Sequence, residues 1–213
     1  MSVDMKGYPK KWRDWTKMPA ILTELELVIG GWQVMQAWEH PLMEVMAAEV
    51  TSNSGDILEI GYGMGISARE IIKRGCRSYT IIEAHPEVAA VAREWAKQQS
   101  VLIDVIEGFW QDVVSDLGKQ FDGILFDTYP LSEEERHCNH FAFIPVAPSL
   151  LRHQGLFTYY SDETVSFRAE HMKLLLTHFS EVKLIKIAKL KPYSDCEYWD
   201  QSEMIIPVAK KLE

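Results

Sequence analysis

The sequence predicts an α/β fold in which a mostly parallel β-sheet is covered by helices on both faces. From about Ser54 onward, short runs rich in Ile, Val and Leu alternate with amphipathic helical stretches. These runs are nearly continuous in apolar residues, as expected for strands that are buried on both sides. The chain has 213 residues, of which 47% are apolar and 25% charged, so one soluble domain with one core is expected.

Seven strands and four helices are predicted in order along this part of the chain. The strands are expected at Asp56–Ile60, Tyr79–Glu83, Val101–Glu107, Phe121–Asp127, Gly155–Tyr160, Val182–Leu190 and Met204–Ala209. The helices are expected at Ser67–Arg74, Pro86–Gln98, Glu133–Leu151 and Ser166–Phe179, with Pro86 in a first turn that tolerates proline. Only residues 191–202 separate the last two strands, which favours an antiparallel pair at a sheet edge.

Residues 1–53 precede the first predicted strand and differ in character from the rest. Four tryptophans stand there among mixed charges: Trp12, Trp15, Trp32 and Trp38. A helical periodicity runs from Pro41 to Val50. We interpret this segment as an N-terminal helical lid over the single domain formed by residues 54–213, since no repeat or long linker indicates a second domain.

Charge and composition exclude several classes of protein. The net charge of −9 and a pI near 5.3 argue against a nucleic-acid partner, because proteins that track phosphates concentrate Lys and Arg, and they suit a cationic ligand better. No signal peptide and no apolar stretch of membrane-spanning length is present. Three scattered cysteines indicate reduced thiols. A cytoplasmic protein that does not bind membranes is therefore expected.

A glycine-rich turn follows the first predicted strand. Its spacing, Glu59-x-Gly61-x-Gly63-x-Gly65, differs from the dinucleotide-binding pattern because Ile66 stands where that pattern requires glycine. Glycines let the backbone turn sharply and approach a ligand where a Cβ atom would collide. The turn therefore predicts a ligand site at the end of this strand.

Two further features suit a nucleoside ligand. Glu83 ends the next strand, where its carboxylate could accept both ribose hydroxyls. Phe109 and Trp110 follow the third strand and are expected to form a slot for adenine, with a role as core aromatics as the less favoured alternative. With the glycine turn, these features resemble the class I methyltransferase fold, a Rossmann-like sheet of seven strands with an antiparallel last strand. The resemblance implies S-adenosylmethionine as cofactor and S-adenosylhomocysteine as product.

Asp127 ends the fourth predicted strand. In this architecture the carboxyl end of that strand faces the transferred methyl group. The segments Asp127-Thr-Tyr-Pro-Leu-Ser-Glu-Glu, Met35-Gln-Ala-Trp-Glu-His-Pro-Leu-Met43, Gly61-Tyr-Gly-Met64 and Phe109-Trp110 resemble the guanidinoacetate N-methyltransferase family. That resemblance implies that Glu39 and Asp127 bind the acceptor guanidinium and that a tryptophan, Trp12 or Trp15, covers the site. The cofactor candidates are Met35, Met43, Glu59, Gly61, Tyr62, Gly63, Met64, Gly65, Ile66, Ser67, Glu83, Ala84, His85, Phe109, Trp110 and Asp127.

The chemistry of guanidines explains why two carboxylates are suited to the acceptor site. A guanidinium has a pKa above 12 and no lone pair free to attack, so it must lose a proton on the way to methylation. Two carboxylates can clamp its planar fork, aim one nitrogen at the methyl group and accept the proton. We therefore expect Asp127 to orient the acceptor and act as base, with Glu39 as the second clamp.

The loop after the fifth strand departs from the family. It reads Tyr159-Tyr-Ser-Asp162-Glu163-Thr, and two acids are a poor receptor for the carboxylate of guanidinoacetate. If Asp162 and Glu163 approach the substrate, the acceptor should carry a second positive group, as arginine does. His137 and His140 lie at helical spacing, but a histidine pair without a third ligand does not indicate a metal site, and no metal is expected.

Several alternatives remain open at this stage. A protein arginine N-methyltransferase of the same family would act on a guanidinium in a polypeptide and would need an open acceptor channel. An aminopropyltransferase would require different glycine-loop and acceptor motifs, and a cofactor-binding regulator would not need Glu39 and Asp127. The resemblance also leaves a homodimer open.

Overall fold

A computed structural model of the chain describes residue 9 and residues 11–211. Residues 1–8 and 10 of the predicted lid and residues 212–213 of the predicted domain lie outside the described residues. The strands are β1 (Ala20–Leu22), β2 (Glu26–Ile29), β3 (Trp32–Gln36), β4 (Asp56–Ile60), β5 (Ser78–Glu83), β6 (Ile103–Glu107), β7 (Phe121–Phe126), β8 (Leu151–Tyr159), β9 (Glu181–Ala188) and β10 (Glu203–Lys210). The α-helices are α1 (His40–Val50), α2 (Ile66–Arg74), α3 (Pro86–Ala96), α4 (Trp110–Val113), α5 (Ala147–Leu150) and α6 (Ala169–His178). Short 3-10 helices are η1 (Trp12–Lys17), η2 (Ala37–Glu39), η3 (Val114–Asp116) and η4 (Asn139–Ala142).

Seven strands form the central sheet in the order β6-β5-β4-β7-β8-β10-β9. All neighbouring pairs from β6 to β8 are parallel, while β10 runs antiparallel to both β8 and β9. The predicted sheet is confirmed, including its antiparallel last strand. The short connection before β10 explains the reversal, because it is a loop that returns the chain beside β9 without a crossover helix.

The two faces of the sheet carry separate hydrophobic cores. Side chains such as Ile57, Ile81 and Leu125 face a core shared with α1, α2 and α3. Their sequence neighbours Leu58 and Ile82 face the opposite core, which α5 and α6 close. Because successive strand residues point to opposite faces, apolar residues at adjacent positions are required, and this requirement is the source of the continuous runs in the sequence.

The predicted helix Glu133–Leu151 is wrong. The chain makes successive turns there, then η4 and the short helix α5. Turn hydrogen bonds such as Cys138 N–H to the Glu135 carbonyl span three residues, and His137 adopts a positive φ of 67°. Pro145 and Pro148 also fall inside the predicted range and lack the N–H that a continuous helix needs. The apolar periodicity instead reflects a segment packed against the sheet.

The prediction that the N-terminal segment is helical is only partly right. It contains η1, η2 and α1, but β1, β2 and β3 form a separate three-stranded antiparallel sheet. Gly30 and Gly31 connect β2 to β3 with φ values of 58° and 87°. Two positive φ angles are what a type I′ hairpin turn requires, so the Gly-Gly pair between apolar runs is the sequence signal for this hairpin.

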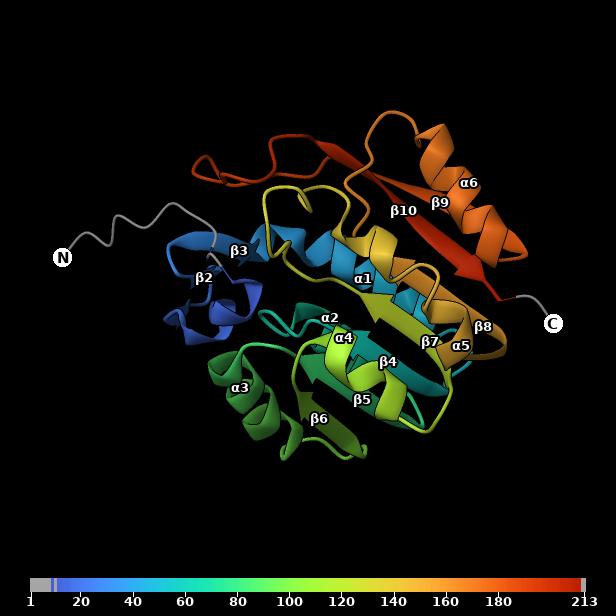
Figure 1. The fold of residues 1–213 in the computed structure, drawn as a ribbon, viewed down its shortest axis with the longest axis horizontal. Coiled ribbons are helices and arrows are strands. Elements are labelled where there is room, and N and C mark those ends of the chain that lie inside the picture. Colours follow the sequence, from blue (N-terminus) through green and yellow to red (C-terminus); the bar gives the residue numbers. More distant parts are fainter. Residues whose placement is uncertain (1–8, 10, 212–213) are drawn as a thin grey trace.

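The small sheet lies at the end of the molecule toward which β5, β6 and β7 point (Figure 1). In open α/β sheets, ligands bind outside the carboxyl ends of the strands. The N-terminal segment therefore stands over the edge where the candidate residues end. Within residues 9 and 11–211, no helix is both long enough and apolar enough to cross a bilayer.

Candidate active site

The glycine turn after β4 has the geometry that its sequence predicts. Gly61, Gly63 and Gly65 have φ values of 91°, 53° and 67°, which residues with a Cβ atom rarely adopt. A Cβ on Gly61 would stand 1.8 Å from the Asp127 carbonyl oxygen, and one on Gly63 would stand 2.8 Å from Met35 Sδ. Gly65 also caps α2. The glycines thus allow the ends of β4, β7 and the N-terminal segment to meet closely.

Gly61→Ala is expected to destabilise the fold more than Gly75→Ala does. Gly75 has a similar φ of 93°, but a Cβ there meets no atom within 4 Å. The positive φ should cost about 1–2 kcal/mol at both positions, and the collision at Gly61 should add about 1–3 kcal/mol. Urea unfolding of both variants measures the difference, and equal losses would contradict a steric role for Gly61.

Glu83 ends β5 and organises the same turn. Its Oε2 accepts the N–H of Tyr62 at 2.9 Å and that of Gly63 at 3.4 Å, while Oε1 accepts the N–H of His85 at 2.8 Å. Burial raises the pKa of Glu83, and these backbone donors act against that rise. Oε1 retains acceptor capacity for a further donor.

Glu59 lies beneath the turn, where it is fully buried. Its carboxylate accepts hydrogen bonds from the hydroxyls of Ser67 and Tyr79. Burial raises the pKa of Glu59 to about 8, against the effect of those two donors. Glu59 therefore joins β4, α2 and β5 and supports the glycine turn from below.

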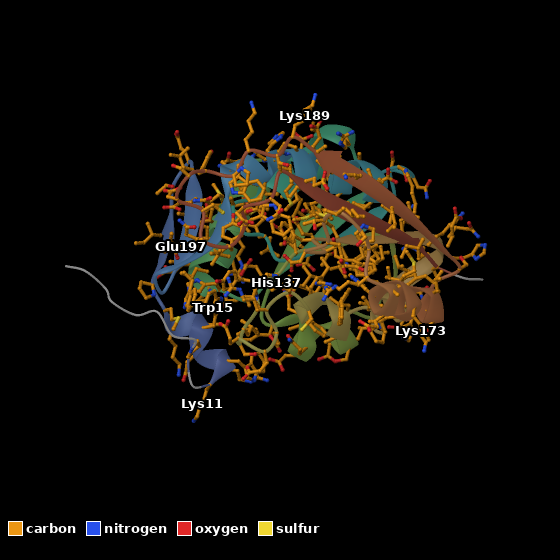
Figure 2. The ribbon with its side chains drawn as sticks, turned by 90° about the horizontal axis from the view of Figure 1, so that it is seen from above. Lys11, Trp15, His137, Lys173, Lys189 and Glu197 are labelled. Carbon is orange, nitrogen blue, oxygen red and sulfur yellow. The ribbon has the colours of Figure 1, made fainter. Side chains whose placement is uncertain are left out.

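Two adjoining cavities open at the carboxyl ends of the strands. The first, of about 150 Å³, is lined by Trp32, Gln33, Val34, Met35, Glu39, Gly61, Tyr62, Gly63, Phe126, Asp127, Thr128, Tyr129, Pro130, Arg136, His137, Asn139, Tyr160, Asp162, Glu197 and Tyr198. The second, of about 100 Å³, is lined by Trp15, Leu27, Ile29, Val34, Ile60, Gly61, Gly63, Ile82, Glu83, Ala84, Gly108, Phe109, Trp110, Gln111, Asp127, Thr128, Tyr129, Leu131, Glu135, Asn139 and Ala142. Asp127, Gly61 and Gly63 border both. Trp15, His137 and Glu197, which belong to these walls, come from distant parts of the chain (Figure 2).

Glu39 enters the first cavity from η2 and is only 3% exposed. Its Oε1 accepts two hydrogen bonds, from the N–H of Gln36 at 2.9 Å and from the hydroxyl of Tyr198 at 2.5 Å. Burial and the nearby Asp127 carboxylate raise the pKa of Glu39 to about 8. Only Oε2 of Glu39 is left with its full acceptor capacity.

Asp127 stands just after β7, where its N–H donates to the Ile60 carbonyl at 2.9 Å and fixes it beside the end of β4. Burial, and then the Asp162 carboxylate, raise the pKa of Asp127 to about 7. Asp162 also lines the first cavity, with a φ of 58° and an oxygen 3.6 Å from His137 Nδ1. Glu39, Asp127 and Asp162 thus line one cavity, and the charged forms of Glu39 and Asp127 are each disfavoured by a neighbouring acid.

Aromatic residues close the second cavity from the N-terminal side. Trp15, 4% exposed, stacks on Tyr129 with ring centroids 5.3 Å apart. Trp12 is not in either wall but packs edge-on against Phe109 at 4.5 Å. Trp110 also lines the cavity and packs edge-on against Phe143. Of the two tryptophans left open by the sequence, Trp15 is the one in the cavity wall.

Several candidate residues lie outside both cavities. Met43 is buried in the core, and the carboxylate of Glu163 contacts Arg168 and His171. His85 is buried, with Nε2 2.8 Å from the Met18 carbonyl oxygen. Glu59, Met64, Gly65, Ile66 and Ser67 are also absent from the walls and surround the glycine turn or lie in α2. Among the described residues, no group of three or more His, Cys, Asp or Glu is arranged to hold a metal ion.

Sequence reasoning missed the tyrosines of the first cavity. Tyr198 comes from the loop between β9 and β10, and Tyr160 follows β8. Both line the cavity, as does Tyr129. Tyr198 could not be found from a motif, because its hydrogen bond to Glu39 spans 159 residues. Tyr160 stands beside the predicted Asp162, so its place at a strand end was the available signal.

The family model described as guanidinoacetate N-methyltransferase matches residues 9–212. Curated relatives include "Protein arginine N-methyltransferase 2" of Aspergillus oryzae, 31% identical over 84% of this chain and 47% of that protein. The protein of the same name from Saccharomyces cerevisiae is 32% identical over 60% of this chain and 32% of that protein. The chain thus spans less than half the length of these two relatives.

Solved structures share the fold at low sequence identity. The N-methyltransferase NodS from Bradyrhizobium japonicum is 14% identical with a TM-score of 0.61, covering 83% of this chain and 97% of its own. Spermidine synthase from Thermotoga maritima is 14% identical with a TM-score of 0.59, covering 91% and 72%. The fold is therefore that of class I methyltransferases. Because the family model covers almost all of its length, the chain belongs to the guanidinoacetate N-methyltransferase family.

Proposed function

We propose that the chain is an S-adenosylmethionine-dependent N-methyltransferase acting on the guanidino group of a small cationic substrate, such as arginine, a related guanidine or guanidinoacetate. The observation that carries this proposal is the meeting of the buried Glu39 and the half-buried Asp127 in the wall of one cavity. The adjoining cavity, which Asp127 also borders, contains Glu83 and Phe109. One acidic chamber for a cation therefore adjoins a chamber suited to a nucleoside.

The second cavity fits the proposed cofactor. The turn at Gly61 and Gly63 leaves space that a Cβ atom would occupy, and Glu83 Oε1 keeps acceptor capacity for a ribose hydroxyl. Phe109, Trp110 and Trp15 supply apolar walls for adenine. When bound, S-adenosylmethionine supplies an electrophilic methyl group carried on a positively charged sulfur.

Asp127 is the group suited to orient the acceptor and take its proton. Among the described residues, none donates a hydrogen bond to the Asp127 carboxylate, so both of its oxygens can receive guanidinium N–H groups. Glu39 offers Oε2, because its Oε1 already accepts from Gln36 and Tyr198. The clamp is thus asymmetric, with a bidentate partner in Asp127 and a single-oxygen partner in Glu39.

Charge supports the same assignment. Two positive charges about 4 Å apart repel by on the order of 4 kcal/mol at an effective dielectric of 20. The acids of the first cavity offset that repulsion between a guanidinium and a sulfonium. In return, a bound cation stabilises the ionised forms of Glu39 and Asp127, which burial disfavours.

Asp162 supports an acceptor with a second positive group. It borders the same cavity as Glu39 and Asp127, and its charge is near enough to raise the pKa of Asp127. We therefore expect kcat/KM for arginine to exceed that for guanidinoacetate by about tenfold or more, as an added charge pair of roughly 1.4 kcal/mol would give. Asp162→Asn should reduce this ratio. Product S-adenosylhomocysteine measured with both acceptors tests this, and a strong preference for guanidinoacetate would overturn it.

A polypeptide acceptor is the second candidate, favoured by the name that the curated relatives share. A peptide with one internal arginine, assayed beside free arginine, separates the two candidates. Higher kcat/KM for the peptide would favour protein arginine methylation. No product from any guanidine, despite measurable binding of S-adenosylmethionine, would favour a regulatory protein over an enzyme.

A further inference from the structure

The hydroxyl of Tyr160 is a buried polar atom without a hydrogen-bond partner among the described residues. Buried hydroxyls are rarely left unpaired, because losing water without gaining a partner costs free energy. Tyr160 lines the first cavity. An unpaired hydroxyl in a cavity wall indicates a partner that comes with the ligand.

The surroundings of this hydroxyl define the chemistry of that partner. The charged or ionisable groups that act on Tyr160 are Glu39, Asp162, Tyr198 and Asp127, three acids and another phenol. Burial, and then the charge of Glu39, raise the pKa of Tyr160 well above its usual range, so the phenol remains neutral. A neutral oxygen among acids is suited to an N–H donor from a cation.

The backbone fixes Tyr160 in this position. Residues 160–163 alternate in direction, so Tyr160 and Asp162 face the cavity while Ser161 and Glu163 bond to β10. The Ser161 hydroxyl donates to the Ile205 carbonyl at 2.5 Å, and the Ile205 N–H donates to the Glu163 carbonyl at 2.7 Å. A segment held in this way presents its side chains with little further loss of freedom on binding.

We propose that Tyr160 binds the acceptor, its hydroxyl oxygen accepting one N–H of the guanidinium beside the carboxylates of Asp127 and Glu39. The proposal rests on the proposed function and adds a residue to its acceptor site. A guanidinium carries several N–H donors in a planar fork. Asp127 and Oε2 of Glu39 do not use all of them, because Oε1 of Glu39 is already occupied. Tyr160 supplies the missing neutral acceptor.

Tyr159 offers a matched control one residue away. It faces the opposite core, where its hydroxyl is hydrogen-bonded to His171 Nε2. Tyr159→Phe removes a satisfied hydroxyl and leaves the buried His171 without that partner, whereas Tyr160→Phe removes an unsatisfied one. Tyr159→Phe should therefore lower stability with little effect on activity, whereas Tyr160→Phe should lower activity without lowering stability.

The test measures Tm and kcat/KM for both variants with arginine and guanidinoacetate. Tyr160→Phe should keep or raise Tm and lower kcat/KM by about tenfold or more for the faster substrate, mainly through KM, as loss of a hydrogen bond to a charged group predicts. Tyr159→Phe should lower Tm by a few degrees and change kcat/KM less than about twofold. Unchanged kcat/KM in Tyr160→Phe would overturn the proposal.

A binding measurement separates this proposal from the proposed function. If the wild-type chain turns over neither guanidine, the assignment of a small guanidine as acceptor fails, and calorimetry with methylguanidinium in the presence of S-adenosylhomocysteine then decides on Tyr160. A Kd at least fivefold weaker in Tyr160→Phe than in wild type would support its role in binding the cation. Equal Kd values, or no binding to wild type, would overturn it.

Discussion

Replacing Asp127 with asparagine should lower kcat by about 10²- to 10⁴-fold, the range expected when a positioned general base is lost. Asparagine keeps the size of the side chain but cannot take the acceptor proton, and its NH₂ group opposes the guanidinium N–H groups. Single-turnover assays with S-adenosylmethionine and arginine measure the effect. Methyl transfer at the wild-type rate would contradict the role assigned to Asp127.

Two controls make that result specific. Asp104→Asn removes an exposed carboxylate from β6, outside both cavities, and should leave kcat unchanged. Binding of S-adenosylhomocysteine to Asp127→Asn should stay within about threefold of wild type, because Glu83 and the glycine turn are intact. A large loss of cofactor binding would instead indicate that Asp127 supports the second cavity.

Acidification should lower kcat/KM steeply. The pKa of Glu39 is raised to about 8 and that of Asp127 to about 7, so both carboxylates gain protons as pH falls through these values. Protonated acids do not bind a guanidinium, which keeps its own charge below a pKa above 12. Between pH 8 and pH 6, kcat/KM should therefore fall by about 100- to 1000-fold, with a log–log slope greater than one.

A pH profile of kcat/KM on wild type and Glu39→Gln measures this effect. The variant should retain an acid limb with a slope near one, because only the Asp127 proton remains in the pair. A flat wild-type profile between pH 6 and pH 8 would show that the carboxylates are ionised in the free protein and would remove the electrostatic argument.

The raised pKa values of Glu39 and Asp127 also predict that folding stability falls as pH rises, whereas kcat/KM rises. A carboxyl whose pKa is raised by folding binds more protons in the native state than in the unfolded state, so its contribution to stability is lost as pH rises toward the folded pKa. Asp127→Asn should therefore stabilise the free protein at pH 8 but not at pH 4. Burying these acids favours substrate binding at the expense of stability.

Much of the fold could be predicted because the spacing of apolar residues along the sequence indicates its strands and helices. The buried strands had to be apolar on both faces, and the glycine turn needed positive φ angles at Gly61, Gly63 and Gly65. The helix expected at Glu133–Leu151 could not be rejected by apolar spacing alone, although Pro145 and Pro148 opposed it. The Gly30-Gly31 pair between two apolar runs, by contrast, is a local hairpin signal that the sequence does contain.

Some residues of the candidate site could likewise be predicted from the sequence, and others could not. Glu83 and Asp127 followed from their positions at strand ends, whereas Glu39 was identified only through family resemblance. Tyr198 depends on a contact between distant parts of the chain, which periodicity does not report. Asp162 lines the first cavity and Glu163 does not, because their side chains point in different directions. Hydrogen bonds between this segment and β10 hold the backbone that sets these directions.

Gln33, in the wall of the first cavity, joins β3 to the loop between β9 and β10. Its side chain donates to the Asp195 carbonyl at 3.0 Å and accepts the Glu197 N–H at 2.8 Å, near the Tyr198 bond to Glu39. Trp199 of the same loop is buried and Tyr198 stacks on Trp38, but the two hydrogen bonds to Gln33 are exposed to solvent. In native-state hydrogen exchange, the Glu197 amide should open at lower free energy than amides of β4. Guanidine recognition would then disappear in partially open molecules whose central strands remain protected.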